Sequence, residues 1–240
     1  MAGTVGLICA AGFAERWGGV LKELLPVANG ITLLERCAWS MIKGGADRLV
    51  LVTRASKLAS QMDRLQRAFQ HTPIAAVLRP ADPGTMWDSM QAGLRFCRGA
   101  RVLFGMPDTL FDGDVFQRLV KDDPTFGLGL FETTQRGRFG ILRELTVTDK
   151  EKGGMFPAMA WGVATWSWSV TEQWLSTPFH RYDEAFSHAL TMALDSDDVN
   201  PHVYLKEYRD FASWGDYTEW MQHNVHTTSQ RAEIAQEFRG

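Results

Sequence analysis

Apolar residues form short unbroken runs in the first part of the chain, and amphipathic stretches separate these runs. Val5–Cys9 and Arg48–Thr53 are mostly apolar, as strands buried on both faces of a sheet are, and Ile74–Leu78 reads as a third strand. Ile31–Lys43 and Lys57–Phe69 instead repeat apolar residues at roughly helical spacing. Strand, helix, strand, helix, strand is the order of βαβ units with right-handed crossovers. The pattern therefore predicts an α/β fold that begins with a parallel sheet.

Strand-like and helix-like stretches continue through the rest of the chain. The sequence predicts further strands at Arg101–Met106, Phe126–Phe131, Met159–Trp166 and Val203–Tyr208, and further helices at Met86–Cys97, Glu172–Thr177 and Tyr182–Leu194. We expect one domain over residues 1–240, with a Rossmann-like architecture: a mixed, mostly parallel central sheet flanked by helices.

The composition excludes several functional classes. Of the 240 residues, 45% are hydrophobic and 22% are charged, which is typical of a globular protein and not of a disordered or membrane chain. The net charge of -3 and a sequence pI near 6.1 give no electrostatic footprint for DNA or RNA. No stretch approaches the roughly 20 apolar residues of a membrane span. We therefore expect neither a nucleic acid nor a membrane as partner.

The three cysteines are Cys9, Cys37 and Cys97. They lie far apart and form no Cys-x-x-Cys pair for zinc or redox chemistry. Each stands in an apolar or helical stretch, which predicts a buried free thiol. Free thiols are typical of a reducing compartment, so we expect a cytoplasmic location.

The turn after the first predicted strand holds the residues with the clearest chemistry. Ala10, Ala11 and Gly12 have little or no side chain, so the backbone N–H groups of this turn can approach a phosphate closely. Arg16 and Lys22 follow and supply the positive charge that a triphosphate and its departing pyrophosphate require. An ordinary strand-to-helix turn with two solvated cations has the same pattern, so the turn alone leaves both interpretations open.

These residues resemble the signature of the sugar-phosphate nucleotidyltransferases, the enzymes that make nucleotide sugars. That family opens with a strand, then Ala-Ala-Gly-x-Gly-x-Arg, and then Pro-Lys-x-Leu-Leu-Pro-Val. This chain has a run from Ala10 to Arg16 and a run from Leu21 to Val27 in the same order. It departs from the signature at Ala14, where the family has its second glycine, and at Leu21, where the family has proline. The resemblance implies the nucleotide-diphospho-sugar transferase fold.

Two later segments extend the resemblance to a nucleotide site and a metal site. Gly84 and Thr85 stand where the family's loop reads the nucleobase, at the start of a predicted helix that Thr85 would also cap. Asp108 follows the strand that ends at Met106, at the sheet edge where open α/β sheets bind ligands. The resemblance implies that Asp108 holds Mg²⁺ on the nucleotide phosphates, although Pro107 replaces the family's glycine before it.

The resemblance also implies a site for a sugar phosphate. Gly140 lies in a segment similar to the family's Phe-Gly-Val-Val. Glu151 and Lys152 resemble the Glu-Lys-Pro motif, in which glutamate holds the sugar hydroxyls and lysine the sugar phosphate. Trp161 lies in a stretch similar to the strand that closes the sugar pocket, where its ring would stack on a sugar face. A solvated hairpin at the Glu-Lys pair and a core position for the tryptophan are the structural alternatives.

Asp216 is the second candidate metal ligand. Relatives end their catalytic domain with Trp-x-Asp-x-Gly-Thr-Pro, and Trp214 and Asp216 follow that outline without the Gly-Thr-Pro. The predicted strand Val203–Tyr208 precedes this segment, and the strand ends at one sheet edge converge on a shared crevice. We therefore expect Asp108 and Asp216 to share one Mg²⁺, with Asp210 as the alternative ligand.

The resemblance implies an enzyme, a Mg²⁺-dependent nucleotidyltransferase that joins a nucleoside triphosphate to a sugar 1-phosphate and releases pyrophosphate. Arg16 would hold the departing pyrophosphate and Lys22 the α-phosphate region. Three alternatives stay open: a cytidylyltransferase acting on another phosphate such as phosphocholine, a relative that binds a nucleotide sugar without catalysis, and a dinucleotide-dependent oxidoreductase. The last would need glycines at Ala14 and Trp17. The nucleobase, the sugar and the formation of a homo-oligomer also stay open.

Overall fold

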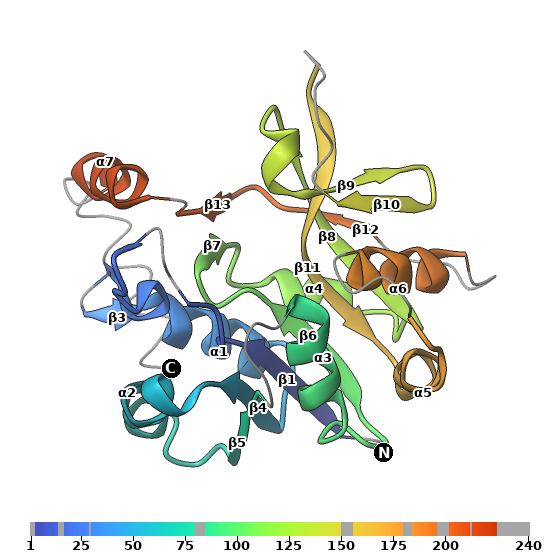
Figure 1. The fold of residues 1–240 in the computed structure, drawn as a ribbon, viewed down its shortest axis with the longest axis horizontal. Coiled ribbons are helices and arrows are strands. Elements are labelled where there is room, and N and C mark those ends of the chain that lie inside the picture. The colour runs from blue at the N-terminus through green and yellow to red at the C-terminus, as the bar shows by residue number, and fades with distance from the viewer. Residues whose placement is uncertain are drawn as a thin grey trace.

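A mixed central sheet organises the fold, with β1 (Thr4–Cys9) in its interior (Figure 1). The computed structural model describes residues 3–13, 17–28, 30–79, 85–149, 156–179, 184–195, 202–211 and 213–224. Within these residues, the sheet also contains β4 (Arg48–Thr53), β5 (Ile74–Leu78), β6 (Arg101–Gly105), β8 (Phe126–Thr133), β9 (Gly140–Arg143), β10 (Thr146–Asp149), β11 (Ala158–Trp166) and β12 (His202–Tyr204). The main path of the sheet is β10-β9-β11-β6-β1-β4-β5, while β8 pairs with β11 and β12 pairs with β8.

The first half of the sheet is parallel. Leu7 of β1 pairs with Val50 of β4 on one side and with Phe104 of β6 on the other, and β4 continues in parallel to β5. β11 then runs antiparallel to β6 and to β8, which turns the second half into a mixed sheet. Because β1 has neighbours on both edges and helices on both faces, its apolar run is buried. The predicted Rossmann-like α/β fold is confirmed.

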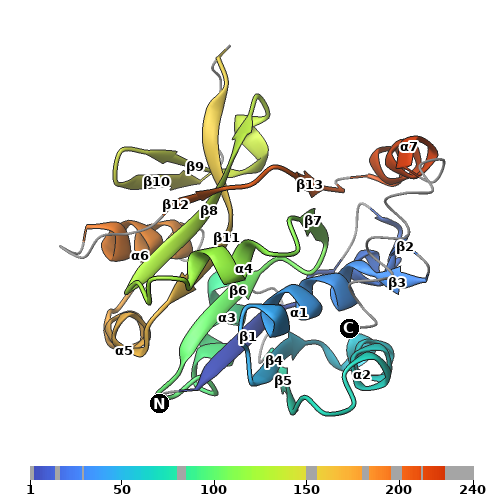
Figure 2. The same cartoon turned by 180° about the vertical axis from the view of Figure 1, so that it is seen from behind.

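Helices cover both faces of the sheet (Figures 1 and 2). One face packs against α1 (Leu33–Lys43), α2 (Ala55–Ala68) and α4 (Val115–Leu119), and the other against α3 (Met86–Leu94), α5 (Trp168–Ser176) and α6 (Ala185–Leu194). Gly93 lets α3 lie directly on the sheet. A Cβ atom there would be 2.4 Å from the side chain of Leu7 and 2.8 Å from that of Val52.

The last helix, α7 (Trp214–Asn224), packs against the beginning of the chain. In both views it lies beside β2 (Pro26–Ala28) and β3 (Ile31–Thr32), which form a two-stranded sheet (Figures 1 and 2). A separate apolar cluster joins these parts: Trp17, Leu25, Val27, Leu33, Leu110, Phe211, Tyr217 and Trp220. The Tyr217 hydroxyl also donates a hydrogen bond to the carbonyl oxygen of Pro26 at 2.6 Å. The C-terminal helix therefore supports the N-terminal segment.

The stretch predicted as one strand, Val203–Tyr208, is divided between two sheets. β12 pairs with β8, while β13 (Tyr208–Asp210) pairs with β7 (Thr109–Phe111). The carboxylate of Asp112 accounts for the break, because it accepts hydrogen bonds from the backbone N–H groups of Lys206 at 3.0 Å and Glu207 at 2.8 Å. These bonds hold the chain where it leaves the central sheet.

The structure also describes the cysteines and the helices that bear on the expectations from composition. All three cysteines are buried and free, as predicted, and burial raises the pKa of each thiol, that of Cys97 to about 12. Among the described residues, no helix combines the length and the apolar character needed to cross a membrane. The organisation of residues 1–240 as one domain stays a prediction.

Candidate functional site

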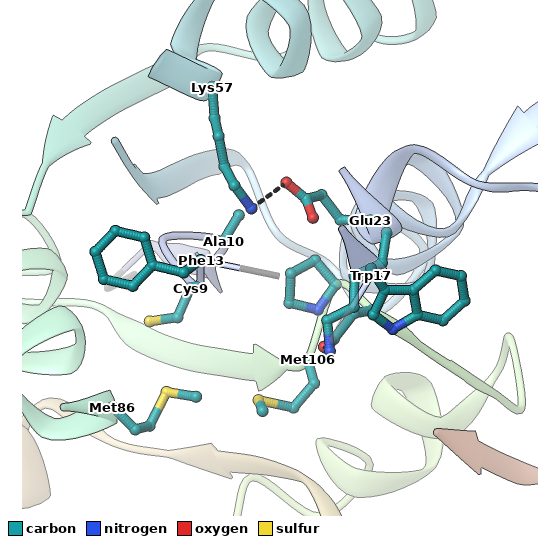
Figure 3. Close-up of a pocket in the computed structure, with 12 residues that line it drawn as sticks. Cys9, Ala10, Phe13, Trp17, Glu23, Lys57, Met86 and Met106 are labelled. Atoms are coloured by element: carbon teal, nitrogen blue, oxygen red, sulfur yellow. Dashed lines mark hydrogen bonds and ion pairs between the residues drawn. The ribbon is translucent and has the colours of Figure 1, made fainter. Parts of the chain in front are cut away.

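A cavity of about 360 Å³ lies at the carboxyl ends of β1 and β6 (Figure 3). This is the sheet edge at which open α/β folds bind ligands. The lining residues come from the turn after β1, from the short 3-10 helix η2 (Lys22–Leu24), from α2 and α3, and from the loop after β6: Cys9, Ala10, Gly12, Phe13, Trp17, Lys22, Glu23, Lys57, Met86, Met106, Pro107 and Asp108. Four residues singled out from the sequence therefore meet here: Ala10, Gly12, Lys22 and Asp108.

The small-residue turn forms one wall of the cavity. Ala10 and Ala11 are buried. The Ala10 N–H donates a hydrogen bond to the carbonyl of Val52 at 2.8 Å, and the Arg54 guanidinium donates one to the carbonyl of Ala11. A Cβ atom added at Gly12 would meet no atom within 4 Å. Glycine at this position therefore leaves open space beside the backbone, rather than relieving a clash.

Lys22 and Asp108 form an ion pair at the cavity. Their side chains are 22% and 16% exposed, so both are largely shielded from bulk water. Asp108 lies in the turn between β6 and β7, which is closed by the Thr109 hydroxyl donating to the Met106 carbonyl at 2.9 Å. The fold thus joins the cation and the carboxylate that the sequence had assigned to phosphate and to metal. Charges in such partly buried surroundings interact more strongly than charges in water.

A buried polar network lies behind Lys22 and was not predicted from the sequence. Glu23, Lys57 and Gln61 are 2%, 5% and 0% exposed. The carboxylate of Glu23 accepts a hydrogen bond from Lys57 Nζ at 2.9 Å (Figure 3). It also accepts one from Gln61 Nε2 at 2.6 Å. Lys57 and Gln61 are four residues apart and so share one face of α2. That spacing was visible in the sequence, but the burial of the face was not.

Two aromatic side chains complete the cavity walls. Trp17 makes edge-to-face contacts with Trp214 and Tyr217 of α7, with ring centroids 5.6 Å and 6.4 Å apart. Phe13 is half-exposed, and the guanidinium carbon of Arg54 lies 3.2 Å from its ring centroid. An exposed aromatic face offers a surface on which a nucleobase can stack. Neither ring had been given a role from the sequence.

Gly140 and Trp161, two of the residues assigned to a sugar site, lie against each other. A Cβ atom at Gly140 would be 2.3 Å from Nε1 of Trp161, so only glycine fits beside the indole. The indole also packs near the rings of Phe104 and Phe186, with centroids 6.3 Å and 5.3 Å away. Neither residue of the pair lines the cavity around Lys22.

The expectation that Asp216 shares a metal ion with Asp108 loses its basis in the structure. Asp216 lies in the first turn of α7 and not at the end of a sheet strand. Its carboxylate accepts the Ser213 N–H at 3.1 Å, and the Ser213 hydroxyl accepts the Asp216 N–H at 3.2 Å, which is a capping arrangement. Asp216 lines a different cavity, of about 320 Å³, as does Asp210. The premise that Asp216 follows a strand of the central sheet was wrong, because the chain leaves that sheet before this segment. Its role as a metal ligand stays a prediction.

Asp210, the alternative ligand, lies nearer to Asp108. In the β7–β13 ladder it is paired with Thr109, the residue that follows Asp108. Burial raises the pKa of Tyr208, and the negative charges of Asp108 and Asp210 raise it further, so both carboxylates act on this one ring. Arg138, in the short helix η3 (Arg136–Arg138), forms an ion pair with Asp210 at 2.8 Å. Asp210 is therefore a second candidate carboxylate beside Asp216, although neither of the two lines the cavity around Lys22.

Thr85 caps α3, as the sequence predicted. Its hydroxyl accepts the Asp88 N–H at 3.2 Å, and the Asp88 carboxylate accepts the Thr85 N–H at 2.6 Å. Its contact with a nucleobase stays a prediction. The remaining candidates lie outside the described residues: Arg16, Gly84, Glu151 and Lys152.

Solved structures with this fold align over nearly the whole chain. A protein named as a glucose-1-phosphate thymidylyltransferase from Bacillus anthracis, in complex with sucrose, has a TM-score of 0.79 at 13% identity and covers 94% of this chain and 96% of its own. A UDP-glucose pyrophosphorylase complexed with UDP-glucose has a TM-score of 0.75 at 14% identity, covering 94% and 99%. The inositol-1-phosphate CTP transferase from T. maritima has a TM-score of 0.70 at 16% identity, covering 95% and 98%. At these identities the similarity shows the fold.

No protein of curated function matches the sequence. The family model of the MobA-like NTP transferase domain matches residues 6–125, which is half of the 240-residue chain. The matched region contains the turn after β1, η2 with Lys22, and the loop with Asp108, so it includes all the residues that line the cavity. The chain therefore belongs to the MobA-like NTP transferase family.

Proposed function

We propose that the protein transfers a nucleotidyl group from a nucleoside triphosphate to a sugar 1-phosphate or a related phosphate monoester and releases pyrophosphate. The observation that carries this proposal is the ion pair of Lys22 and Asp108 in the cavity at the carboxyl ends of β1 and β6. A cation there can bind a phosphate directly, and a carboxylate can bind one through a metal ion. Membership of an NTP transferase family supports the triphosphate as one substrate.

The residues around the cavity suit this reaction. A phosphate oxygen of the acceptor forms a bond to the α-phosphorus, the bond from that phosphorus to its bridging oxygen breaks, and pyrophosphate leaves with the electron pair. Lys22 would donate hydrogen bonds to the α-phosphate oxygens as negative charge builds there. The backbone N–H groups of the turn around Gly12 would contact the phosphates. From the sequence, Arg16 would hold the departing pyrophosphate.

Mg²⁺ fits this site through Asp108. The ion is usually held by one or two carboxylates together with substrate phosphates and water. Among the described residues, no group of three or more His, Cys, Asp or Glu side chains is placed to hold a metal ion, so substrate phosphates would complete its coordination. Asp108 would hold the ion, with Asp210 as the second carboxylate. Bound there, it supplies positive charge that neutralises the phosphates.

The acceptor is proposed from the residues beyond the cavity and from the relatives. The structural neighbours are named for glucose 1-phosphate, UDP-glucose and inositol 1-phosphate. A sugar 1-phosphate is our first candidate, bound at Gly140 and Trp161 together with Glu151 and Lys152. Inositol 1-phosphate is not a sugar 1-phosphate, so its presence in one neighbour's name favours another alcohol phosphate, such as phosphocholine, as the second candidate.

Pyrophosphate release tests the proposal. The purified protein is given each common nucleoside triphosphate with a panel of sugar 1-phosphates, inositol 1-phosphate and phosphocholine, with and without Mg²⁺ or Mn²⁺. We expect release only when a triphosphate, an acceptor and the divalent ion are all present. Triphosphate binding in calorimetry without release for any acceptor would instead identify a relative that binds nucleotide sugars without catalysis.

The compartment of the protein is part of the proposal. Its three cysteines are free and buried, which is typical of proteins that work where thiols stay reduced. We therefore propose a cytoplasmic location, which imaging of the tagged full chain in its own cell would test.

A further inference from the structure

We propose that Glu23 and Lys57 are positioning residues for the reaction: the buried hydrogen bonds that the Glu23 carboxylate accepts from Lys57 and Gln61 fix η2 so that Lys22 faces Asp108 in the cavity. The inference rests on the proposed function and adds two residues to it. Both side chains line the cavity, but their polar atoms bond to each other, and neither would contact the reacting atoms. They would act through the direction in which they hold Lys22.

The short helix η2 has little structure of its own. It is three residues long, and Leu21 at its N-cap makes no side-chain capping bond. Its backbone bonds run from the Leu24 N–H to the Leu21 carbonyl at 2.9 Å and from the Leu25 N–H to the Lys22 carbonyl at 3.1 Å. A single 3-10 turn is marginal by itself. Contacts with the rest of the protein must therefore set its orientation.

Glu23 makes that contact. Its carboxylate is almost fully buried and accepts hydrogen bonds from both Lys57 and Gln61 at one oxygen, Oε1. Figure 3 shows Lys57 reaching from α2 toward Glu23 at the edge of the cavity. Lys22 and Glu23 are neighbours in a helix of three residues. Fixing the Glu23 carboxylate therefore also fixes the direction in which the Lys22 side chain leaves the backbone.

Gln61 extends the network to the other half of the phosphate site. Its Nε2 also donates to the carbonyl of Ala10 at 3.2 Å, and the Thr53 hydroxyl donates to its Oε1. Ala10 begins the small-residue turn after β1. One buried carboxylate, that of Glu23, therefore connects the turn that would bind phosphates with the helix that presents Lys22. The network sets the spacing between these two parts of the site.

The chemistry of the pair favours a geometric role over a purely stabilising one. Burying two charges is unfavourable, and a buried ion pair is often no more stable than apolar residues of the same shape. Apolar packing lacks the directed hydrogen bonds that Lys57 and Gln61 donate to Glu23. This difference separates the two roles in an experiment.

The double variant Glu23→Leu/Lys57→Met replaces the pair with apolar side chains of similar size. We expect its melting temperature to stay at or above that of the wild type, while kcat falls by about tenfold or more, because a misplaced group loses its preorganisation. KM for the triphosphate should change by less than about threefold, as expected when an interaction of the transition state is lost. Independently of turnover, acetylation of Lys22 followed by mass spectrometry should increase severalfold, since the lysine is no longer held against Asp108.

Three further variants make the test specific. Glu23→Gln keeps an oxygen acceptor for both donors, so the folded variant should retain more kcat than the double variant, while its melting temperature should fall because the Lys57 charge loses its buried partner. Arg64→Met removes another ion pair of α2, that with Glu35 at 2.7 Å, and should change neither kcat nor the labelling of Lys22. If the double variant does not fold, Gln61→Leu interrupts the network while leaving the ion pair, and it should lower kcat and raise the labelling.

Wild-type kcat and wild-type labelling of Lys22 in the folded double variant, or in Gln61→Leu, would overturn the proposal. The failure of the proposed function gives a different result. In that case the wild type itself releases no pyrophosphate, and the labelling of Lys22 alone decides whether the network positions it.

Discussion

At the level of single residues, the proposed chemistry depends most on the charge of Lys22. In the structure this charge faces the carboxylate of Asp108, and the two side chains occupy the wall of one cavity. A triphosphate entering the cavity would offer Lys22 stronger anionic partners, while a metal ion would do the same for Asp108. In the proposed reaction, the ion pair would keep both groups in place until substrate arrives.

Replacing Lys22 by alanine should lower kcat/KM for nucleotidyl transfer by about 100-fold, since one lost preorganised donor typically costs ~3 kcal/mol in the transition state. The fold should be unaffected, because η2 is held by Glu23 and not by Lys22. Steady-state pyrophosphate release measures the effect. Lys121→Ala, at an exposed lysine between α4 and β8, is the matched control. Wild-type turnover in Lys22→Ala would leave Lys22 only the role of an ion-pair partner of Asp108.

Replacing Asp108 by asparagine should raise the Mg²⁺ concentration for half-maximal turnover by at least ~10-fold, since even changes to groups that only orient a ligand have effects of this size. Asp216→Asn is the matched control. Asparagine can still cap α7 with Ser213, so this variant should keep the metal requirement of the wild type. Titration of Mg²⁺ in the turnover assay compares the two. An equal shift in both variants would restore Asp216 as a metal ligand.

At the level of elements, α3 begins with a capping box at the position where the family resemblance implies a nucleobase contact. Thr85 and Asp88 cap the helix reciprocally. Thr85→Ala should therefore destabilise the protein by about 1 kcal/mol, while Thr85→Ser keeps the hydroxyl and most of the stability. Urea unfolding at constant pH gives both values. Weaker triphosphate binding by folded Thr85→Ala, with normal binding by Thr85→Ser, would add the nucleobase contact that the family resemblance implies.

The elements that could be predicted are those with a local signal. β4 and β5 have the predicted bounds, and β1 differs by one residue, because each is an unbroken apolar run. The insertion of β11 between β6 and β9 has no such signal, since strand order depends on packing between distant segments. The division of Val203–Tyr208 was missed for the same reason. It depends on Asp112, which is distant in sequence.

The residues of the candidate site likewise divide into those with a local signal in the sequence and those without one. Lys22 and Asp108 were found because each has a recognisable neighbour in the sequence, a small-residue turn or the end of a strand. Glu23 and Lys57 were missed, since charged residues are almost always exposed and only the tertiary fold buries this pair. Asp216 was assigned from a motif outline, but its local bonds to Ser213 make it a capping residue.

At the level of the whole molecule, burial of His202 at the start of β12 makes stability depend on pH. Burial lowers the pKa of this imidazole from its ordinary value of 6.5. Below pH 6.5 the unfolded chain therefore binds a proton that the folded protein does not. The contribution of the neutral imidazole to the free energy of unfolding is fully present above pH 6.5 and is lost as the pH falls below it.

The variant His202→Gln should show a smaller loss of unfolding free energy between about pH 7.5 and pH 5.5 than the wild type, because glutamine does not titrate. His71→Gln, at an exposed histidine, should keep the wild-type loss. Denaturant titrations at the two pH values measure the difference. Equal losses in the wild type and His202→Gln would show that another group is responsible.

The place of β11 in the sheet has a consequence for synthesis on the ribosome. β6 ends at Gly105, but its outer neighbour β11 ends only at Trp166. At roughly 5–20 residues per second, the ribosome needs several seconds to add the intervening segment. During that time the parallel half of the sheet has left the ribosome with one edge of β6 unpaired. The nascent chain is then most open to strand pairing with other chains, and a chaperone that covers this edge would protect it.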